Sequence, residues 1–176
     1  MIERPLIQII SSIAESYELD PQLVLGLVDV ESSGDRWAWN PEPRYRYFWN
    51  VRANLPFRSV SAAEIATEIP PSDFPSLAGD RDQEWWAQQA SWGLMQIMGA
   101  TARENGFSGR YLTQLCEIDL NLRIGCTILK NLKGWSKGDM ARMLAAYNGG
   151  RRGNIVPPYR NVAYATKVIN RSIRYA

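Results

Sequence analysis

Helical periodicity is clear at both ends of the chain and absent from one long stretch between them. Residues 4–17 carry apolar side chains three and four positions apart, the pattern of a helix with one apolar face. Asp20 and Pro21 then supply an N-cap and a first-turn proline. The pattern predicts a second helix that runs to Glu31 and ends before Gly34.

From about residue 36 to 90 the periodicity fades, and prolines and aromatic residues accumulate. Ser61 and Glu64 have capping-box spacing and predict one short helix near 61–69. After residue 90 the pattern predicts further helices at about 93–105, 117–133, 139–148 and 159–173. We therefore expect a mostly α-helical protein with one long irregular segment, and long loops in compact domains are usually functional.

The size and composition are those of a single globular domain. The chain has 176 residues, of which 45% are hydrophobic and 22% charged, unlike a disordered or fibrous chain. Its longest aliphatic runs, such as residues 23–25, are far shorter than the ~20 apolar residues of a membrane-spanning helix. We expect one domain over residues 1–176 and no integral membrane segment.

The absence of histidine narrows the possible chemistry. It removes histidine-based triads and acid–base catalysis, and most zinc sites. Cys116 and Cys126 would lie about 15 Å apart along a helix, too far for a disulfide. We expect both to be free or buried thiols, which leaves carboxylates, Tyr, Ser, Lys and Arg as candidate functional groups.

Charge is unevenly distributed although the net charge is only +2. Residues 1–31 hold six acidic side chains against Arg4 alone, and residues 150–176 hold six basic side chains and no acidic one. The basic region is open to two interpretations: a surface for an anionic polymer, or a solvated helix face. Because no nucleic-acid-binding motif accompanies it, we expect no nucleic-acid partner.

Glu31 occupies an unusual position for a carboxylate. It follows Val24, Leu27 and Val28 at helical spacing and so lies on the apolar face of its own helix. Burial there would raise the carboxyl pKa toward the range of a general acid. The alternatives are a buried Glu paired with Arg, or a helix-end Glu turned to water.

Two further segments carry candidate binding groups. Gly93 would let a ligand approach the backbone, Met95 offers a polarisable surface for a sugar ring, and Gln96 offers both a donor and an acceptor. Tyr147 and Asn148 precede a glycine pair at a predicted helix end. Each of these residues also has a structural interpretation, as core or cap.

In combination and in this order, these segments resemble the lytic transglycosylase domain of the soluble lytic transglycosylase type, which is related in fold to goose-type lysozyme. The resemblance is carried by Glu31-Ser32, Gly93-Leu94-Met95-Gln96, Ala146-Tyr147-Asn148-Gly149-Gly150, and Tyr164 with Lys167-Val168. Residues 119–125 also resemble the family's helix that carries an Asn and, four residues later, a Gly. The resemblance implies a mostly α, lysozyme-like fold in which residues 41–90 are an insert.

The resemblance also implies an activity and a set of site residues. The family cleaves the β-1,4 bond between N-acetylmuramic acid and N-acetylglucosamine in peptidoglycan and forms a 1,6-anhydromuramoyl product, without a metal or cofactor. Glu31 matches the single catalytic acid and base. The resemblance also implies a set of substrate-binding positions, which are Ser91, Met95, Gln96, Tyr147, Asn148 and Tyr164. Ser32 is an alternative to Ser91.

Other functions stay open on the sequence. A hydrolytic lysozyme on the same fold would need a second carboxylate, from Asp35, Glu42, Asp73 or Glu84. A non-catalytic glycan-binding or virion structural module would keep only the groove. The aromatic residues of the insert are either sugar-stacking platforms or packing groups: Tyr45, Tyr47, Trp49, Trp85 and Trp86.

The expected partner is a peptidoglycan glycan strand, bound by a monomer at the bacterial cell wall, in the periplasm. The N-terminus shows no basic segment followed by an apolar stretch and a small-residue cleavage site, so no secretory signal is visible. This leads us to expect a phage-encoded endolysin or a virion-associated wall-cutting enzyme.

Overall fold

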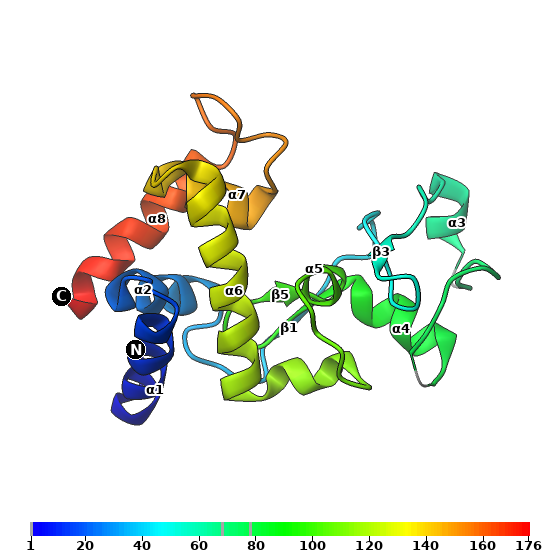
Figure 1. The fold of residues 1–176 in the computed structure, drawn as a ribbon, viewed down its shortest axis with the longest axis horizontal. Coiled ribbons are helices and arrows are strands. Elements are labelled where there is room, and N and C mark those ends of the chain that lie inside the picture. Colours follow the sequence, from blue (N-terminus) through cyan, green and yellow to red (C-terminus); the bar gives the residue numbers. More distant parts are fainter. Residues whose placement is uncertain (1, 68, 78) are drawn as a thin grey trace. The chain divides into compact units, whose positions relative to one another are not determined.

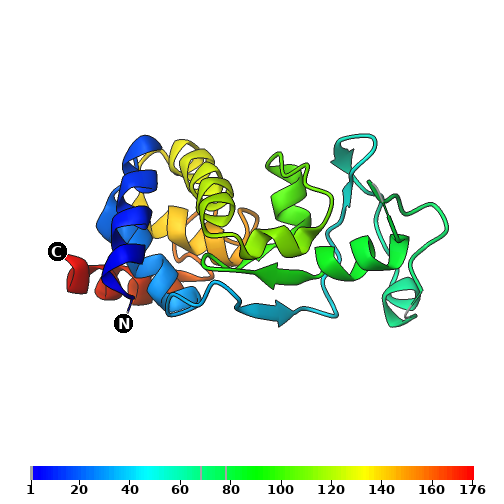
Figure 2. The same cartoon turned by 90° about the horizontal axis from the view of Figure 1, so that it is seen from below.

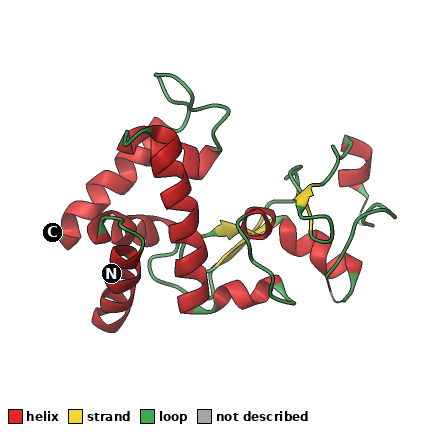
Figure 3. Cartoon of the chain, in the orientation of Figure 1, coloured by secondary structure: helices red, strands yellow, loops and turns green. Residues whose placement is uncertain are grey.

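The computed structural model describes residues 2–67, 69–77 and 79–176 (Figure 1). Most of the regular structure is helical (Figure 3), which confirms the predicted mostly α fold class. The chain divides into two compact units. Unit 1 contains the residues up to Asp35 together with Gly125–Ala176, and unit 2 is Arg36–Ile124. That residues 1–176 act as one domain stays a prediction.

Unit 1 is built around a buried helix. Its elements are α1 (Arg4–Ser16), α2 (Pro21–Glu31), α7 (Met140–Gly149), α8 (Val162–Ser172) and the 3-10 helix η2 (Ile173–Tyr175). Helix α2 packs against α1 and α8, and α8 also packs against α7 (Figure 1). Every residue from Leu23 to Asp29 is buried. At Gly26 the backbone of Ser172 leaves no room for a Cβ atom, so α2 and α8 approach closely.

The ends of these helices follow the local sequence. The Asp20 side chain accepts a hydrogen bond from the Gln22 amide at 2.9 Å, so α2 begins at Pro21 as predicted. The Asp139 side chain caps α7 in the same way. Helix α7 ends at Gly149, and its C-cap Gly150 has a φ of 73°, in the left-handed region that favours glycine.

The acidic and basic segments at the two ends of the chain both belong to unit 1. Asp29 of α2 is buried and accepts a hydrogen bond from Arg171 Nη1 of α8 at 3.1 Å. Arg142 lies over the ring of Trp135 at 4.0 Å, and Arg151 lies over the same ring at 5.7 Å. Part of the basic region is therefore used inside the unit.

Unit 2 combines short strands with short helices. Strands β1 (Trp39–Pro41), β4 (Ala90–Trp92) and β5 (Ile97–Met98) form an antiparallel sheet in the order β1-β4-β5. In Figure 2, β1 and β4 run side by side. The remaining elements are β2 (Trp49–Asn50), β3 (Leu55–Pro56), α3 (Ala62–Ala66), α4 (Arg81–Gln88), α5 (Gly99–Glu104) and the 3-10 helix η1 (Leu112–Cys116). Helix α6 (Ile118–Ser136) begins in unit 2 and ends in unit 1.

The predicted helix over 93–105 is wrong in its first half. Residues 90–98 form the β4–β5 hairpin, and α5 begins only at Gly99. The reason is in the turn: Gly93 and Gln96 have φ values of 70° and 47°, which a right-handed helix excludes. Helix α4 was not predicted, although Asp80 caps it by accepting from the Asp82 amide at 2.9 Å.

Aromatic side chains form a local core within residues 41–90. Phe48 and Trp85 stack with parallel rings, their centroids 4.1 Å apart. Phe74 meets both rings edge-on, with centroid distances of 5.6 and 5.0 Å. Val60 is buried in the same cluster. Trp85 is thus a packing residue, as one of the two interpretations of the insert aromatics proposed.

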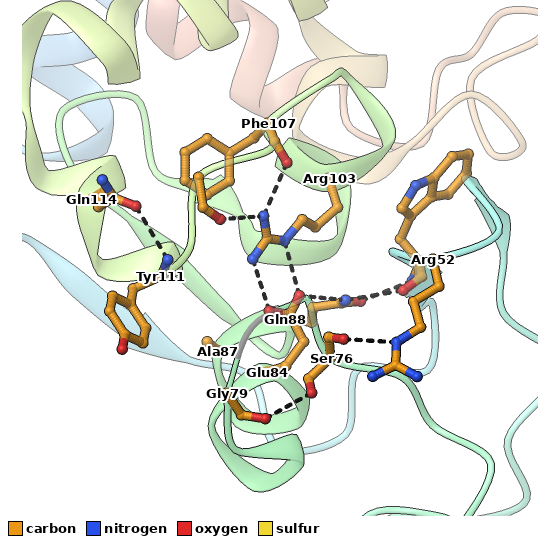
Figure 4. Close-up of polar contacts among 12 residues, drawn as sticks. Arg52, Ser76, Gly79, Glu84, Ala87, Gln88, Arg103, Phe107, Tyr111 and Gln114 are labelled. Atoms are coloured by element: carbon orange, nitrogen blue, oxygen red, sulfur yellow. Dashed lines mark hydrogen bonds and ion pairs between the residues drawn. The ribbon is translucent and has the colours of Figure 1, made fainter.

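A buried polar network ties this segment to the rest of unit 2 (Figure 4). The Glu84 carboxylate accepts hydrogen bonds from Arg103 Nε and Nη2 at 2.9 and 2.8 Å, and from Gln88 Nε2 at 2.9 Å. Arg103 Nη1 donates to two backbone carbonyls within residues 107–109, at 3.0 and 2.7 Å. Gln88 also bonds both backbone groups of Trp49. The network therefore joins α4, α5 and β2.

Two expectations about single features can also be compared with the structure. Cys116 and Cys126 are both buried thiols outside any disulfide, as predicted. Among the helices of residues 2–67, 69–77 and 79–176, none combines the length and the apolar character needed to cross a bilayer.

Candidate active site

Glu31 is the last residue of α2 and is half-buried. Its carboxylate accepts a hydrogen bond from the hydroxyl of Tyr164, which α8 presents. Burial raises the pKa of Glu31, whereas the Tyr164 hydrogen bond and the charge of Lys167 lower it by less. The raised pKa agrees with the position of Glu31 on the apolar face of its helix.

Two tyrosines are close enough to Glu31 to respond to its charge. The pKa of Tyr147 and that of Tyr164 are both raised, in each case first by burial and then by the negative charge of Glu31. Both phenols therefore stay protonated at neutral pH. They can donate hydrogen bonds to the carboxylate or to a ligand, but they cannot supply a phenolate base.

Lys167 adds a positive charge to this group. It follows Tyr164 by three residues, so the two side chains lie on the same side of α8. Its side chain is exposed, and its charge favours the ionised form of Glu31. The group thus contains a carboxyl whose pKa burial raises and a cation whose charge favours the ionised form of that carboxyl.

Asn148 follows Tyr147 and is held by a chain of asparagine side chains. Its Oδ1 accepts a hydrogen bond from Asn161 Nδ2 at 2.8 Å, and the backbone N–H of Asn161 donates to Asn154 Oδ1 at 3.1 Å. Asn154 is fully buried, and its Nδ2 donates to the carbonyls of Ala145 and Gly150 at 3.1 and 2.8 Å. Asn154 and Asn161 thus connect the end of α7 to the start of α8. Sequence reasoning missed both, because nothing in the pattern marks a loop Asn as buried.

Ser91 and Gln96 form a second group, in unit 2. The Ser91 hydroxyl donates to Gln96 Oε1 at 2.8 Å. Gln96 Nε2 donates to the carbonyls of Ala38 and Gly93, both at 3.0 Å. The Gln96 amide is therefore committed to contacts inside the unit, and these contacts support its left-handed backbone conformation.

Gly93 and Met95 are fixed by a buried asparagine of α6. Asn121 Oδ1 accepts from the Met95 amide at 2.9 Å, and its Nδ2 donates to the carbonyls of Trp92 and Leu115 at 2.9 and 2.8 Å. A Cβ atom on Gly93 would meet the Asn121 side chain and the Leu115 carbonyl. Gly93 is thus needed because Asn121 and the Leu115 carbonyl approach its backbone closely. The sequence had suggested that a ligand makes this close approach. Met95 itself is fully buried.

The structure therefore brings together Glu31, Tyr147 and Tyr164 in unit 1. Asn148 directly follows Tyr147 at the end of α7 and is bonded to Asn161. It brings together Ser91, Met95 and Gln96 around one turn of unit 2. Within residues 2–67, 69–77 and 79–176, no group of three or more Cys, Asp or Glu side chains is placed to hold a metal ion.

A half-buried carboxyl with a raised pKa that accepts a hydrogen bond from a phenol is typical of general acid–base catalysis. The chain belongs to the transglycosylase SLT domain family, whose sequence profile matches residues 8–156. No curated protein matches the sequence. The matched range includes Glu31 and the turn at residues 93–96, and ends before Tyr164.

Membership of this family confirms the resemblance and the lysozyme-like, mostly helical fold. At the level of the family it implies a glycan-cleaving lytic transglycosylase with peptidoglycan as its substrate, acting on the cell wall.

Proposed function

We propose that this protein cleaves the β-1,4 bond between N-acetylmuramic acid and N-acetylglucosamine with Glu31 as its single catalytic acid and base. The observation that carries the proposal is the state of Glu31: its carboxyl is half-buried, its pKa is raised, and Tyr164 donates to it. A raised pKa extends the pH range in which a carboxyl is protonated, and this suits Glu31 to act as a general acid.

The reaction then needs only one protein carboxyl. In the first step Glu31 gives its proton to the glycosidic oxygen while the bond from that oxygen to the anomeric carbon breaks. In the second step the Glu31 carboxylate takes a proton from the muramoyl 6-hydroxyl, whose oxygen bonds to the anomeric carbon. The product is a 1,6-anhydromuramoyl end, and Glu31 is protonated again.

The other site residues have supporting roles in this proposal. Tyr164 orients the carboxyl, and Tyr147 and Asn148 bind the sugar beside it. The side chains of Ser91 and Gln96 are hydrogen-bonded to each other, and Met95 is buried. We infer that these three act on the glycan through the shape of the turn at residues 93–96.

A muramidase on the same fold is the second candidate. It requires a second carboxylate about 5–9.5 Å from the first, free to activate water or to attack the sugar. Glu84 is buried in its pair with Arg103, and Asp73 is paired with Arg58 at 2.7 Å. Glu42 accepts from Asn40 at 2.8 Å. The structural partners of these three acids favour the single-carboxylate mechanism, and Asp35 is the remaining candidate for the second carboxylate of a muramidase.

The test is mass spectrometry of the muropeptides released from purified sacculi. We expect 1,6-anhydro products, lighter by one water than reducing-end products, from the wild type. Glu31→Gln is expected to release none while keeping the fold. Glu15→Gln is the matched control, because Glu15 is an exposed carboxylate on α1 of the same unit.

Each other result decides between the candidates. Reducing-end products would identify a muramidase. Full activity of Glu31→Gln would refute the site assignment, whatever the product. No product from any of the proteins would leave a glycan-binding module.

A further inference from the structure

Unit 2 contains a pocket whose lining includes three tryptophans. The pocket has a volume of about 190 Å³. Its lining includes Trp39, Trp86, Trp92, Leu112, Gln83 and Thr113. None of these residues takes part in the proposed acid–base chemistry, so the pocket needs an explanation of its own.

The tryptophan rings are held in place by the secondary structure. Trp39 of β1 lies directly opposite Trp92 of β4, with ring centroids 6.1 Å apart and planes inclined at 45°. The Trp92 indole donates to the carbonyl of Ala87 in α4 at 3.0 Å. Trp86 precedes that residue in the same helix, so both the strand and the helix fix the geometry of the pocket.

Two of the three tryptophans of the pocket are exposed. Trp39 is 56% exposed and Trp86 is 41% exposed. Exposed aromatic side chains grouped around one pocket indicate a binding surface, because burial of the same rings would stabilise the fold. The contrast with Trp85, which is buried in the local aromatic core, separates the two roles that the insert aromatics can have.

The chemistry of the lining defines the ligand. The lining carries no charged side chain, so it offers nothing to an anionic polymer or a lipid headgroup. Gln83 and Thr113 supply an amide and a hydroxyl beside the apolar rings. A pyranose matches this surface, since the C–H bonds of its apolar face meet the negative face of an indole and its substituents hydrogen-bond at the rim.

The size of the pocket agrees with a single ring. Pockets for drug-sized ligands measure about 300–1,000 Å³, which is larger than this one. Trp92, one of the lining residues, stands between Ser91 and Gly93 in the chain, so the pocket and the turn at residues 93–96 share the β4–β5 hairpin.

We propose that this tryptophan pocket is an accessory glycan subsite of unit 2 that binds one N-acetylated pyranose ring. The proposal rests on the proposed function in taking the glycan strand of peptidoglycan as the ligand. The pocket holds the strand and takes no part in bond cleavage. Its loss therefore raises KM on sacculi and leaves kcat largely unchanged.

The test measures binding of N-acetylchitotetraose to the full chain in the Glu31→Gln background. Indole N–H signals of the ¹⁵N-labelled protein identify which tryptophans respond. We expect saturable shifts of the Trp39, Trp86 and Trp92 signals. Trp86→Ala and Trp39→Ala are expected to weaken binding roughly three- to tenfold each, the loss of one aromatic contact.

Trp37→Ala is the matched control, because Trp37 is 67% exposed in the same unit and does not line the pocket. Its binding constant is expected to stay unchanged. Trp86→Phe keeps an aromatic face and is expected to recover part of the loss. Circular dichroism and thermal unfolding of each variant show whether it keeps the fold.

Unchanged binding in both pocket variants, or indole shifts confined to other tryptophans, would overturn the proposal. An equal loss in Trp37→Ala would also overturn it. Failure of the proposed function has a different signature, since Glu31→Gln would then release product from sacculi whether or not the tetrasaccharide occupies the pocket.

Discussion

Replacing Glu84 by Gln removes one negative charge from a buried network and preserves the shape of the side chain. Glu84 is 5% exposed and Arg103 is 2% exposed, so the variant leaves a guanidinium cation buried without its counter-charge. Breaking a buried pair in this way costs about 3–5 kcal/mol. Because a domain is stable by only about 5–15 kcal/mol, we expect a loss of roughly a fifth or more of the stability of unit 2.

The double variant Glu84→Leu with Arg103→Met tests the reasoning. It removes both charges together, which is often nearly neutral in a protein interior. It also deprives the carbonyls of Phe107 and Gly109 of their donor. Gly109 is partly exposed and can bond to water, so we expect a net cost of about 1–3 kcal/mol, less than that of Glu84→Gln alone.

Equilibrium urea unfolding followed by tryptophan fluorescence measures both effects. Every tryptophan except Trp135 lies within unit 2, so the signal reports mainly on that unit. Asp73→Asn is the matched control, because it removes a carboxylate from an exposed pair with Arg58 and should cost far less. A loss below about 1 kcal/mol in Glu84→Gln, or a larger loss in the double variant, would refute the reasoning.

Three further outcomes follow from contacts described above. Tyr164→Phe removes a hydrogen bond that lowers the pKa of Glu31, so the pKa of Glu31 rises and its carboxyl stays protonated to higher pH. We expect the alkaline limb of the pH profile of kcat/KM to shift to higher pH, and a limb that does not shift would contradict this. Gly93→Ala combines a positive φ with a clash against Asn121, and we expect poor folding, measured as loss of urea resistance. Asn154→Ala leaves the α7–α8 loop without its anchor, so we expect faster proteolysis in that loop and a lower kcat; unaltered cleavage kinetics would argue against the anchor.

The sequence predicted the helices of unit 1 well because strong local signals mark them. The Asp20 cap and Pro21 define the start of α2, and its apolar face placed Glu31 correctly at a half-buried helix end. Local pattern carries no information on which residue meets Glu31. Tyr164 lies 133 positions further along the chain, and only the family resemblance pointed to it.

The sequence predicted unit 2 less well because its elements are short. Strands of two or three residues show no alternation, and the turn between β4 and β5 depends on left-handed residues that include Gln96, which is not a glycine. Trp85 and Trp86 are neighbours in α4 with opposite environments, since successive side chains on a helix point about 100° apart. Aromatic composition alone does not separate a core residue from a pocket residue.

The division of the chain has a consequence for the order of events during synthesis. Unit 2 is one continuous segment, whereas unit 1 takes its parts from before and after it. Translation proceeds from the N-terminus, and compact units fold as their residues emerge. All of unit 2 has therefore been synthesised while Glu31 still lacks α8 and its Tyr164 hydroxyl. A chain interrupted before residue 164 carries Glu31 without its hydrogen-bond donor Tyr164, so under the proposed function an incomplete product is expected to cleave no glycan.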